Sequence, residues 1–386
     1  MGKKIFFLLI IILLFSLSST NAIQNNYRYL QNDHFKSIRT TFRQIDINKD
    51  NRISIPQCIQ TLLSTSHPKP LQDFTFLPED IILSDDAYHN TSEKLSTEWW
   101  YFDAKLKQHY TVQFSIHLYD FYDMKFITIN LNIYHETDTI IQHRTMHQID
   151  TFQILQTTPL IIKNDDILMK GSYDNKNNTF LYQISYSTHN ASIDLNYQST
   201  TKGWKGTTPA GDWAVFLPQS NVNGTITLNN QIIPVQGKGY HDHNWNVTVN
   251  AGLNFGWIWG KTNTNSYTLT WSNIMTTWFL GKPLLVVNKQ QDGYYNIPAD
   301  SLDISVTSVQ FQNGYIIPYG FILIGETENI SLFAEISIKS TDYSSVLGVI
   351  NYWRYHIQTQ GTLTVHNHSE KIEDDNIAEF IRFRFY

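Results

Sequence analysis

From about residue 85 to its end, the chain consists of short runs in which apolar and polar side chains alternate. Examples are FITINLNIYHE at residues 126–136 and TFLYQISYST at residues 179–188, and clusters of Gly, Asn and Asp separate the runs. Alternation with a period of two predicts β-strands with one face in a core, and the clusters predict turns between antiparallel neighbours. We therefore expect a mainly β protein.

The number of these runs limits the possible architecture. About sixteen short strands over about 300 residues are too many for one small barrel, and they fit two antiparallel β-barrels in tandem. We predict a first barrel over residues 85–250 and a second over residues 251–386. Residues 66–84 contain three prolines, which favours a linker.

The N-terminal residues 1–22 have the pattern of a secretory signal peptide. Lys3 and Lys4 precede an apolar run from Ile5 to Leu17, and small and polar residues lead to Ala22, where we expect cleavage. The run is shorter than the about twenty residues that a membrane-spanning helix needs, and no second such run follows. We expect a secreted mature chain without a transmembrane segment.

Composition narrows the possible partners and the means of stabilisation. The chain carries 28 basic and 34 acidic residues, and cleavage would also remove two lysines, so we expect no nucleic-acid partner. Cys58 is the only cysteine, which excludes an intrachain disulfide. Asn-x-Ser/Thr sequons predict a glycoprotein if the host is a eukaryote. They begin at Asn90, Asn177, Asn190, Asn223, Asn246, Asn329 and Asn367.

Residues 23–65 resemble a helix–loop–helix unit of the EF-hand type. Apolar residues recur at helical spacing on both sides of a polar loop whose oxygen-bearing residues alternate, which is the arrangement that Ca²⁺ requires. Gln57 stands where such a loop carries a bidentate glutamate, so one charge and one ligand oxygen are missing. The segment is either a calcium site or a packing module. The candidate calcium ligands are Asp46, Asn48, Asp50, the backbone carbonyl of Arg52, and Gln57.

The sequence GKGYHDHNWN at residues 237–246 is the strongest candidate for a functional site. On a strand, successive side chains point to opposite faces. His241, His243 and Trp245 then share one face, and Tyr240, Asp242 and Asn244 share the other. The two histidines could bind a metal ion, but such a site needs a third protein ligand, which the sequence does not identify. They could equally be hydrogen-bonded core residues.

A second cluster, EWWYFD, occupies residues 98–103, and by itself it is typical of barrel packing. Together with GKGYHDHNW and with FGWIWGK at residues 255–261, it resembles the family of AttH-like proteins, carotenoid 1,2-hydratases (hydroxyneurosporene synthases) and fungal Diels–Alderases. The resemblance covers roughly residues 85–386. It implies two successive lipocalin-like barrels and a large apolar ligand, held in the barrel cavities or between the domains, with no cofactor for the barrels.

The resemblance also implies roles for the motif residues. Alkene hydration needs an acid that protonates carbon and aromatic faces that stabilise the resulting cation, whereas cycloaddition needs a dry, shaped cavity. Where we would expect a hydratase to carry a tyrosine and then an acid, this chain has Tyr267 and no carboxylate, which argues against carotenoid hydration. The catalytic candidates are His243, His241, Asp242 and Tyr267. The ligand-binding candidates are Trp245, Asn244, Glu98, Trp99, Trp100, Tyr101 and Trp257.

Three function classes remain open. The first is an exported hydratase, cyclase or isomerase that acts on a hydrophobic polyene or terpenoid. The second is a lipocalin-like carrier that binds such a ligand without converting it. The third is an interaction protein in which a calcium-responsive N-terminal segment matters more than the barrels. The sequence determines neither the ligand nor the oligomeric state.

Overall fold

The structure is a computed structural model. It describes residues 52–54, 75–91, 96–121, 124–248, 256–277, 280–290, 292–346 and 350–382. The expected signal peptide and most of the EF-hand-like segment lie outside the described residues, as do the candidate calcium ligands Asp46, Asn48, Asp50 and Gln57.

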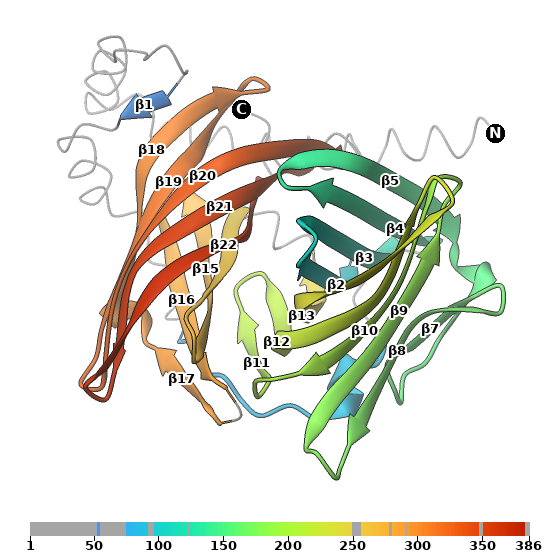
Figure 1. Ribbon diagram of the computed structural model, residues 1–386, viewed down its shortest axis with the longest axis horizontal. Coiled ribbons are helices and arrows are strands. Elements are labelled where there is room, and N and C mark those ends of the chain that lie inside the picture. Colours follow the sequence, from blue (N-terminus) through green and yellow to red (C-terminus); the bar gives the residue numbers. More distant parts are fainter. Residues whose placement is uncertain are drawn as a thin grey trace.

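The described chain forms two strongly curled antiparallel sheets that lie beside each other (Figure 1). The first sheet follows a short 3-10 helix, η1 (Leu83–Asp86), and contains a second, η2 (Ile149–Thr151). Its strands are β2 (Ser96–Leu106), β3 (Tyr110–Phe121), β4 (Met124–His135), β5 (Asp138–Gln148), β6 (Phe152–Ile154), β7 (Leu160–Lys163), β8 (Asp166–Asp174), β9 (Thr179–Ser187), β10 (Ala191–Ser199), β11 (Trp204–Thr208), β12 (Gly211–Leu228) and β13 (Gln231–Thr248).

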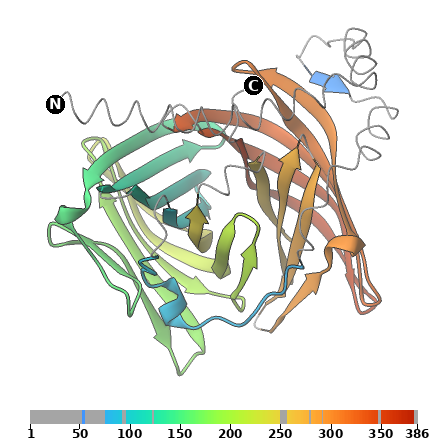
Figure 2. The ribbon, with the colours of Figure 1, turned by 180° about the vertical axis from the view of Figure 1, so that it is seen from behind.

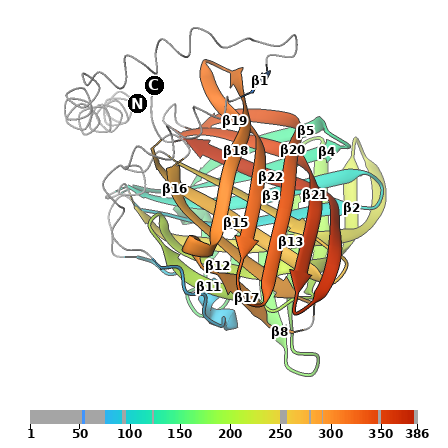
Figure 3. The same ribbon diagram turned by 90° about the vertical axis from the view of Figure 1, so that its left-hand side faces the viewer.

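The second sheet takes up the rest of the chain and the short strand β1 (Arg52–Ser54), which pairs with β18. Its other strands, with the 3-10 helix η4 (Ala299–Ser301), are β14 (Gly256–Asn263), β15 (Tyr267–Thr277), β16 (Leu280–Lys289), β17 (Tyr294–Ile297), β18 (Leu302–Gln312), β19 (Tyr315–Glu326), β20 (Ile330–Val346), β21 (Ile350–Val365) and β22 (His368–Arg382). Figure 3 shows β18 to β22 side by side, with strands of the first sheet behind them.

Both sheets follow the same plan. Each is an up-and-down meander in which a strand near its start pairs with its last strand, β2 with β13 and β14 with β22. In each, the strands on either side of a 3-10 helix, β5 and β6 or β17 and β18, are not adjacent in the strand order. The predictions of a mainly β chain and of tandem curled antiparallel units are confirmed.

The hairpin of β12 and β13 carries the histidine motif, and its turn explains its register. Asn229 and Asn230 both have positive φ, 48° and 66°, as a two-residue turn between twisted strands requires. Asparagine accepts this backbone region more readily than most residues. The turn aligns Leu228 with Gln231, and two register shifts around Leu217 then place His243 opposite Ala214.

Within the described residues, apolar side chains form three buried clusters. One lies within the first sheet and one within the second. The third joins the two sheets and is rich in aromatic rings: it contains Phe76, Tyr101, Trp204, Trp213, Val215, Tyr240, Trp259, Ile274, Leu284, Val286 and Ile377. The faces of the two sheets therefore meet in a buried layer that is rich in aromatic rings.

Residues 75–91, here called the crossing segment, run from the second sheet to the first (Figure 2). Asn296 in β17 donates a hydrogen bond to the carbonyl of Phe76 at 2.9 Å. Glu79 and Lys205 in β11 exchange backbone hydrogen bonds of 2.7 and 2.9 Å. The segment thus connects both sheets before it reaches β2. Among the described residues, no helix has the length and apolarity needed to cross a membrane.

Candidate functional site

The two motifs of the sequence lie on neighbouring strands. β2 and β13 pair so that Trp100 lies opposite His243, Tyr101 opposite Asp242 and Phe102 opposite His241. Because side chains alternate along both strands, the paired motifs divide between the two faces of the first sheet.

The motif residues on the two faces have different surroundings. Five motif residues point toward the core of the first sheet. They are Glu98, Trp100, His241, His243 and Trp245. Five others point toward the second sheet. They are Trp99, Tyr101, Tyr240, Asp242 and Asn244. Trp257 in β14 belongs to this second group, since it packs on the same aromatic layer and stacks with Trp99. Tyr267 belongs to neither group, because it lies in the core of the second sheet.

On the inner face, imidazoles and carboxylates alternate in one connected chain. Asp86 Oδ2 lies 2.9 Å from His241 Nε2, and Asp86 Oδ1 lies 3.1 Å from His243 Nδ1. Glu98 Oε1 lies 2.9 Å from His243 Nε2 and 3.2 Å from His89 Nδ1, and it also accepts the backbone N–H of His89 at 3.0 Å. The order is His241, Asp86, His243, Glu98, His89.

Burial and the neighbouring charges shift the pKa values of these buried side chains in opposite directions. Burial alone would raise the pKa of the Asp86 carboxyl, but His241 and His243 lower it to about 2. Burial would also raise the pKa of Glu98, and the hydrogen bonds from His243 and His89 bring it below its usual value. Burial would lower the pKa of His243, but the two carboxylates raise it to about 9. His243 is therefore a weak acid held between two anions.

Aromatic rings cover the inner-face chain. His241 stacks on Phe102 with ring centroids 3.8 Å apart, and His243 stacks on Trp100 at 4.5 Å. At the outer end, His89 stacks on Trp245 at 4.0 Å, and the side chain of His89 is 26% exposed. Trp245 also lines a surface pocket of about 490 Å³.

On the face toward the second sheet, Asp242 is the central polar group. Its carboxylate accepts hydrogen bonds from the hydroxyl of Tyr240 at 2.8 Å and from Trp213 Nε1 at 3.0 Å. Burial raises the pKa of Asp242 to about 7; these two hydrogen bonds lower it, and the charges of Glu379 and Asp103 raise it further. The carboxyl group therefore exchanges a proton near neutral pH, which suits a general acid or base.

Aromatic rings from both sheets enclose Asp242. Trp259 in β14 packs against Tyr240 and Tyr101, with ring centroids 5.1 and 5.7 Å apart. Trp99, Asn244 and Trp257 are only half-buried, so this layer reaches the surface at their end. We call the group of Asp242, Tyr240, Trp213, Tyr101 and Trp259 the between-sheet site.

The second sheet contributes buried cations next to the between-sheet site. Lys261 forms an ion pair with Asp103 and lies 4.7 Å from the centroid of the Tyr240 ring. Arg354 forms an ion pair with Glu379 and donates a hydrogen bond to the Tyr101 hydroxyl at 3.2 Å. Each charge is paired, as burial requires.

Several residues of both groups were not identified from the sequence. Asp86 and His89 come from the crossing segment, where a polar stretch before β2 has no distinguishing pattern. Lys261 lies inside the FGWIWGK motif, and its place there could have identified it. Arg354 and Glu379 belong to long strands whose pairing with the rest of the site follows from tertiary contacts alone.

Fold and site together define a class: a tandem lipocalin-like protein with a buried acid in the aromatic layer between its two units. The fold is that of solved structures. A protein from Nitrosomonas europaea, provisionally described as an AttH, matches with a TM-score of 0.55 and 12% identity over 79% of this chain and 98% of its own. Kievitone hydratase from Nectria haematococca matches with a TM-score of 0.54 and 12% identity, over 78% of this chain and 92% of its own. No family model and no curated protein sequence matches.

Proposed function

We propose that the protein is an enzyme that transfers a proton between Asp242 and an apolar, unsaturated small molecule held at the between-sheet site. The product would be a hydrated, cyclised or isomerised polyene or terpenoid. One observation carries the proposal: a carboxyl group is buried among the rings of Tyr240, Trp213 and Trp259, where hydrogen bonds from Tyr240, Trp213 and Asn244 hold it in place.

The chemistry follows from that arrangement. In a hydration, the protonated Asp242 carboxyl donates its proton to one alkene carbon, and a cation develops on the neighbouring carbon. The rings around Asp242 stabilise this cation through their faces. Water adds to it, and the proton that the adduct loses returns to the Asp242 carboxylate. In an isomerisation, the cation instead loses a proton from an adjacent carbon to the same carboxylate. Neither route requires an organic cofactor.

The proposal revises the roles expected of the other catalytic candidates. His243 and His241 are fully buried on the opposite face of β13, among carboxylates that keep the pKa of His243 high. Tyr267 lies in the core of the second sheet. A hydratase would be expected to carry an acidic residue after the tyrosine that corresponds to Tyr267, and this chain has none there. In the proposed mechanism, Asp242 takes the role of that acid. The similarity of fold to a protein named as a hydratase supports a reaction of this kind.

The test is a conversion assay with Asp242→Asn. A mixed polyene and terpenoid extract is incubated with the wild type and with the variant, and both are compared by mass spectrometry. We expect the wild type to convert a component, giving either a gain of one water or an isomer of equal mass at a new retention time. Asp242→Asn should lose at least a hundredfold of this rate, in line with the loss of a general acid.

A matched control separates the role of the site from a general effect of neutralising a carboxylate. Asp194 in β10 is exposed and belongs to none of the groups described above, and Asp194→Asn should convert at the wild-type rate. Full activity in Asp242→Asn would refute the role of this residue. An unchanged extract, with one component retained by the wild-type protein, would refute catalysis and establish the alternative, a carrier of an apolar ligand.

We also propose that the mature chain is exported and glycosylated. The signal-like N-terminus supports export, and the asparagines of all seven sequons are exposed. A shift in mass after treatment with peptide N-glycosidase tests glycosylation. The proposed calcium response of the EF-hand-like segment is tested by calorimetric titration of the full chain with Ca²⁺, where the absence of heat would argue against it.

A further inference from the structure

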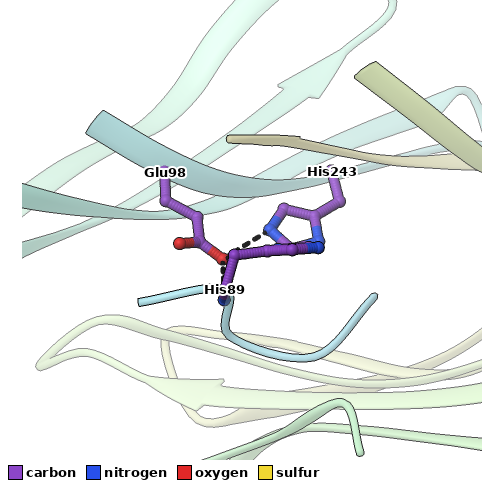
Figure 4. Close-up of side chains that lie close together, drawn as sticks. All are labelled: His89, Glu98 and His243. Atoms are coloured by element: carbon purple, nitrogen blue, oxygen red, sulfur yellow. Dashed lines mark hydrogen bonds and ion pairs between the residues drawn. The ribbon is translucent and has the colours of Figure 1, made fainter. Parts of the chain in front are cut away.

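Three side chains from three separate elements converge on one point inside the first sheet (Figure 4). His89 comes from the crossing segment, Glu98 from β2 and His243 from β13. One ligand atom from each residue lies within 4.8 Å of the others. We propose that these three residues bind a single divalent transition-metal ion, with Zn²⁺ as the best match.

The type of ligand supports zinc. Two imidazole nitrogens and one carboxylate oxygen form a set that Zn²⁺ commonly uses, with one position left for water or another ligand. In a tetrahedral site with bonds of about 2.0–2.1 Å, neighbouring ligand atoms lie about 3.3 Å apart. Glu98 Oε1 is 2.9 Å from His243 Nε2 and 3.2 Å from His89 Nδ1. Small side-chain movements would therefore admit the ion.

The second layer of contacts also fits a metal site. A histidine that binds a metal usually points its other ring nitrogen at a carboxylate or carbonyl, which fixes the ring orientation. Asp86 Oδ1 lies 3.1 Å from His243 Nδ1, and the other oxygen of Asp86 is held by His241. Asp86 Oδ1 and His243 Nδ1 form an ion pair without a hydrogen bond in this geometry, and His243 Nε2 faces Glu98.

A buried oxygen at the same point has no partner. Glu98 is 2% exposed, and its Oε2 forms no hydrogen bond within the described part of the chain. A buried polar atom of this kind calls for an explanation such as an ion. The carboxylate could bind the metal through Oε1 alone or through both oxygens. The alternative occupant is a proton on His243 Nε2, donated to Glu98.

The metal site is independent of the proposed enzyme site, because Asp242 points to the opposite face of β13. Its consequence is mechanical. An ion held by His89, Glu98 and His243 would fasten the crossing segment to the two strands that close the first sheet. The side chain of His89 is 26% exposed, so a water molecule on that side would be the fourth ligand.

The experiment uses the tag-free full chain. The protein is treated with a chelator, dialysed, and reloaded with Zn²⁺ or Co²⁺ in the presence of excess Ca²⁺, which keeps the EF-hand-like segment out of the measurement. Elemental analysis gives the metal content, and the visible absorption of Co²⁺ reports tetrahedral coordination. We expect one ion per chain in the wild type, and a melting temperature that rises on loading because the ion binds the folded state.

Two variants and a control complete the test. His89→Ala changes a partly exposed residue outside the sheets, and Glu98→Gln keeps the size of the side chain. Both should lose the bound ion and the rise in melting temperature. His189→Ala removes an exposed histidine in the turn after β9 and should keep both. Wild-type protein that retains no metal after loading, or His89→Ala with full tetrahedral Co²⁺ absorption, would overturn the proposal, whatever the outcome of the Asp242 assay.

Discussion

Replacing Asp242 with asparagine should remove a loss of stability that the wild type undergoes between pH 4 and pH 7. In the folded chain, burial raises the pKa of this carboxyl from 3.8 to about 7. In the unfolded chain the same group ionises near pH 4. Between these two values the folded state holds a proton that the unfolded state has lost. Stability is therefore fully present below pH 4, falls as pH rises toward 7, and stays reduced above it.

The magnitude follows from the size of the shift. About three pH units correspond to about 4 kcal/mol, at about 1.4 kcal/mol per unit. Asparagine cannot ionise, so the variant should not show this loss. The free energy of unfolding of Asp242→Asn minus that of the wild type should therefore increase by up to about 4 kcal/mol between pH 4 and pH 7. A constant offset from altered hydrogen bonds to Tyr240 and Trp213 would not change this slope.

Urea unfolding at a series of pH values, followed by tryptophan fluorescence, measures this difference. Asp194→Asn is the control, since an exposed carboxylate should give a curve parallel to that of the wild type. Parallel curves for Asp242→Asn between pH 4 and pH 8 would refute the reasoning, because they would mean that Asp242 ionises in the folded chain as readily as in the unfolded one.

Three further predictions concern single residues. Tyr240→Phe removes the hydrogen bond onto Asp242 and should lower stability by about 1–3 kcal/mol, while the pH–rate profile of any conversion moves to higher pH. The pKa of His356 is lowered to about 4 by burial and by the charges of Arg354 and Lys105. The free energy of unfolding should therefore fall by up to about 3 kcal/mol as pH drops from 6.5 to 4. An acid titration of His356→Gln should lack this loss. Gly256→Ala would place a Cβ 1.8 Å from the carbonyl oxygen of Ile381 at a φ of +155°, so thermal unfolding should show a loss above about 3 kcal/mol.

The sequence predicted the β-rich fold and the direction of side chains on the motif strands. A period of two is a local property, so it placed His241 and His243 on one face and Asp242 on the other without knowledge of the fold. The partners of these residues could not be predicted in the same way. Asp86 lies 155 residues before His241 in the chain, and their contact depends on how the crossing segment packs.

Because tertiary packing cannot be predicted from local patterns, the placement of Tyr267 also differed from the expectation. Its position on the strand after FGWIWGK suggested closeness to the motif, but alternation along β15 directs it into the core of the second sheet. Arg354 and Lys261 show the converse case: each reaches the between-sheet site through the packing of two sheets. The predicted signal peptide and calcium loop lie outside the described residues and stay predictions.

The pairing of β2 with β13 has a consequence for the order in which the molecule is made. This pair joins the beginning of the first unit to its end, so it closes a loop of more than a hundred residues and forms late in folding. During synthesis, the edge of β2 that pairs with β13 stays unpaired until β13 has been made. Tyr240, Asp242 and His243 therefore join their partners on β2 in the last step of building the first unit, and a chain that stops before Tyr240 would lack all three.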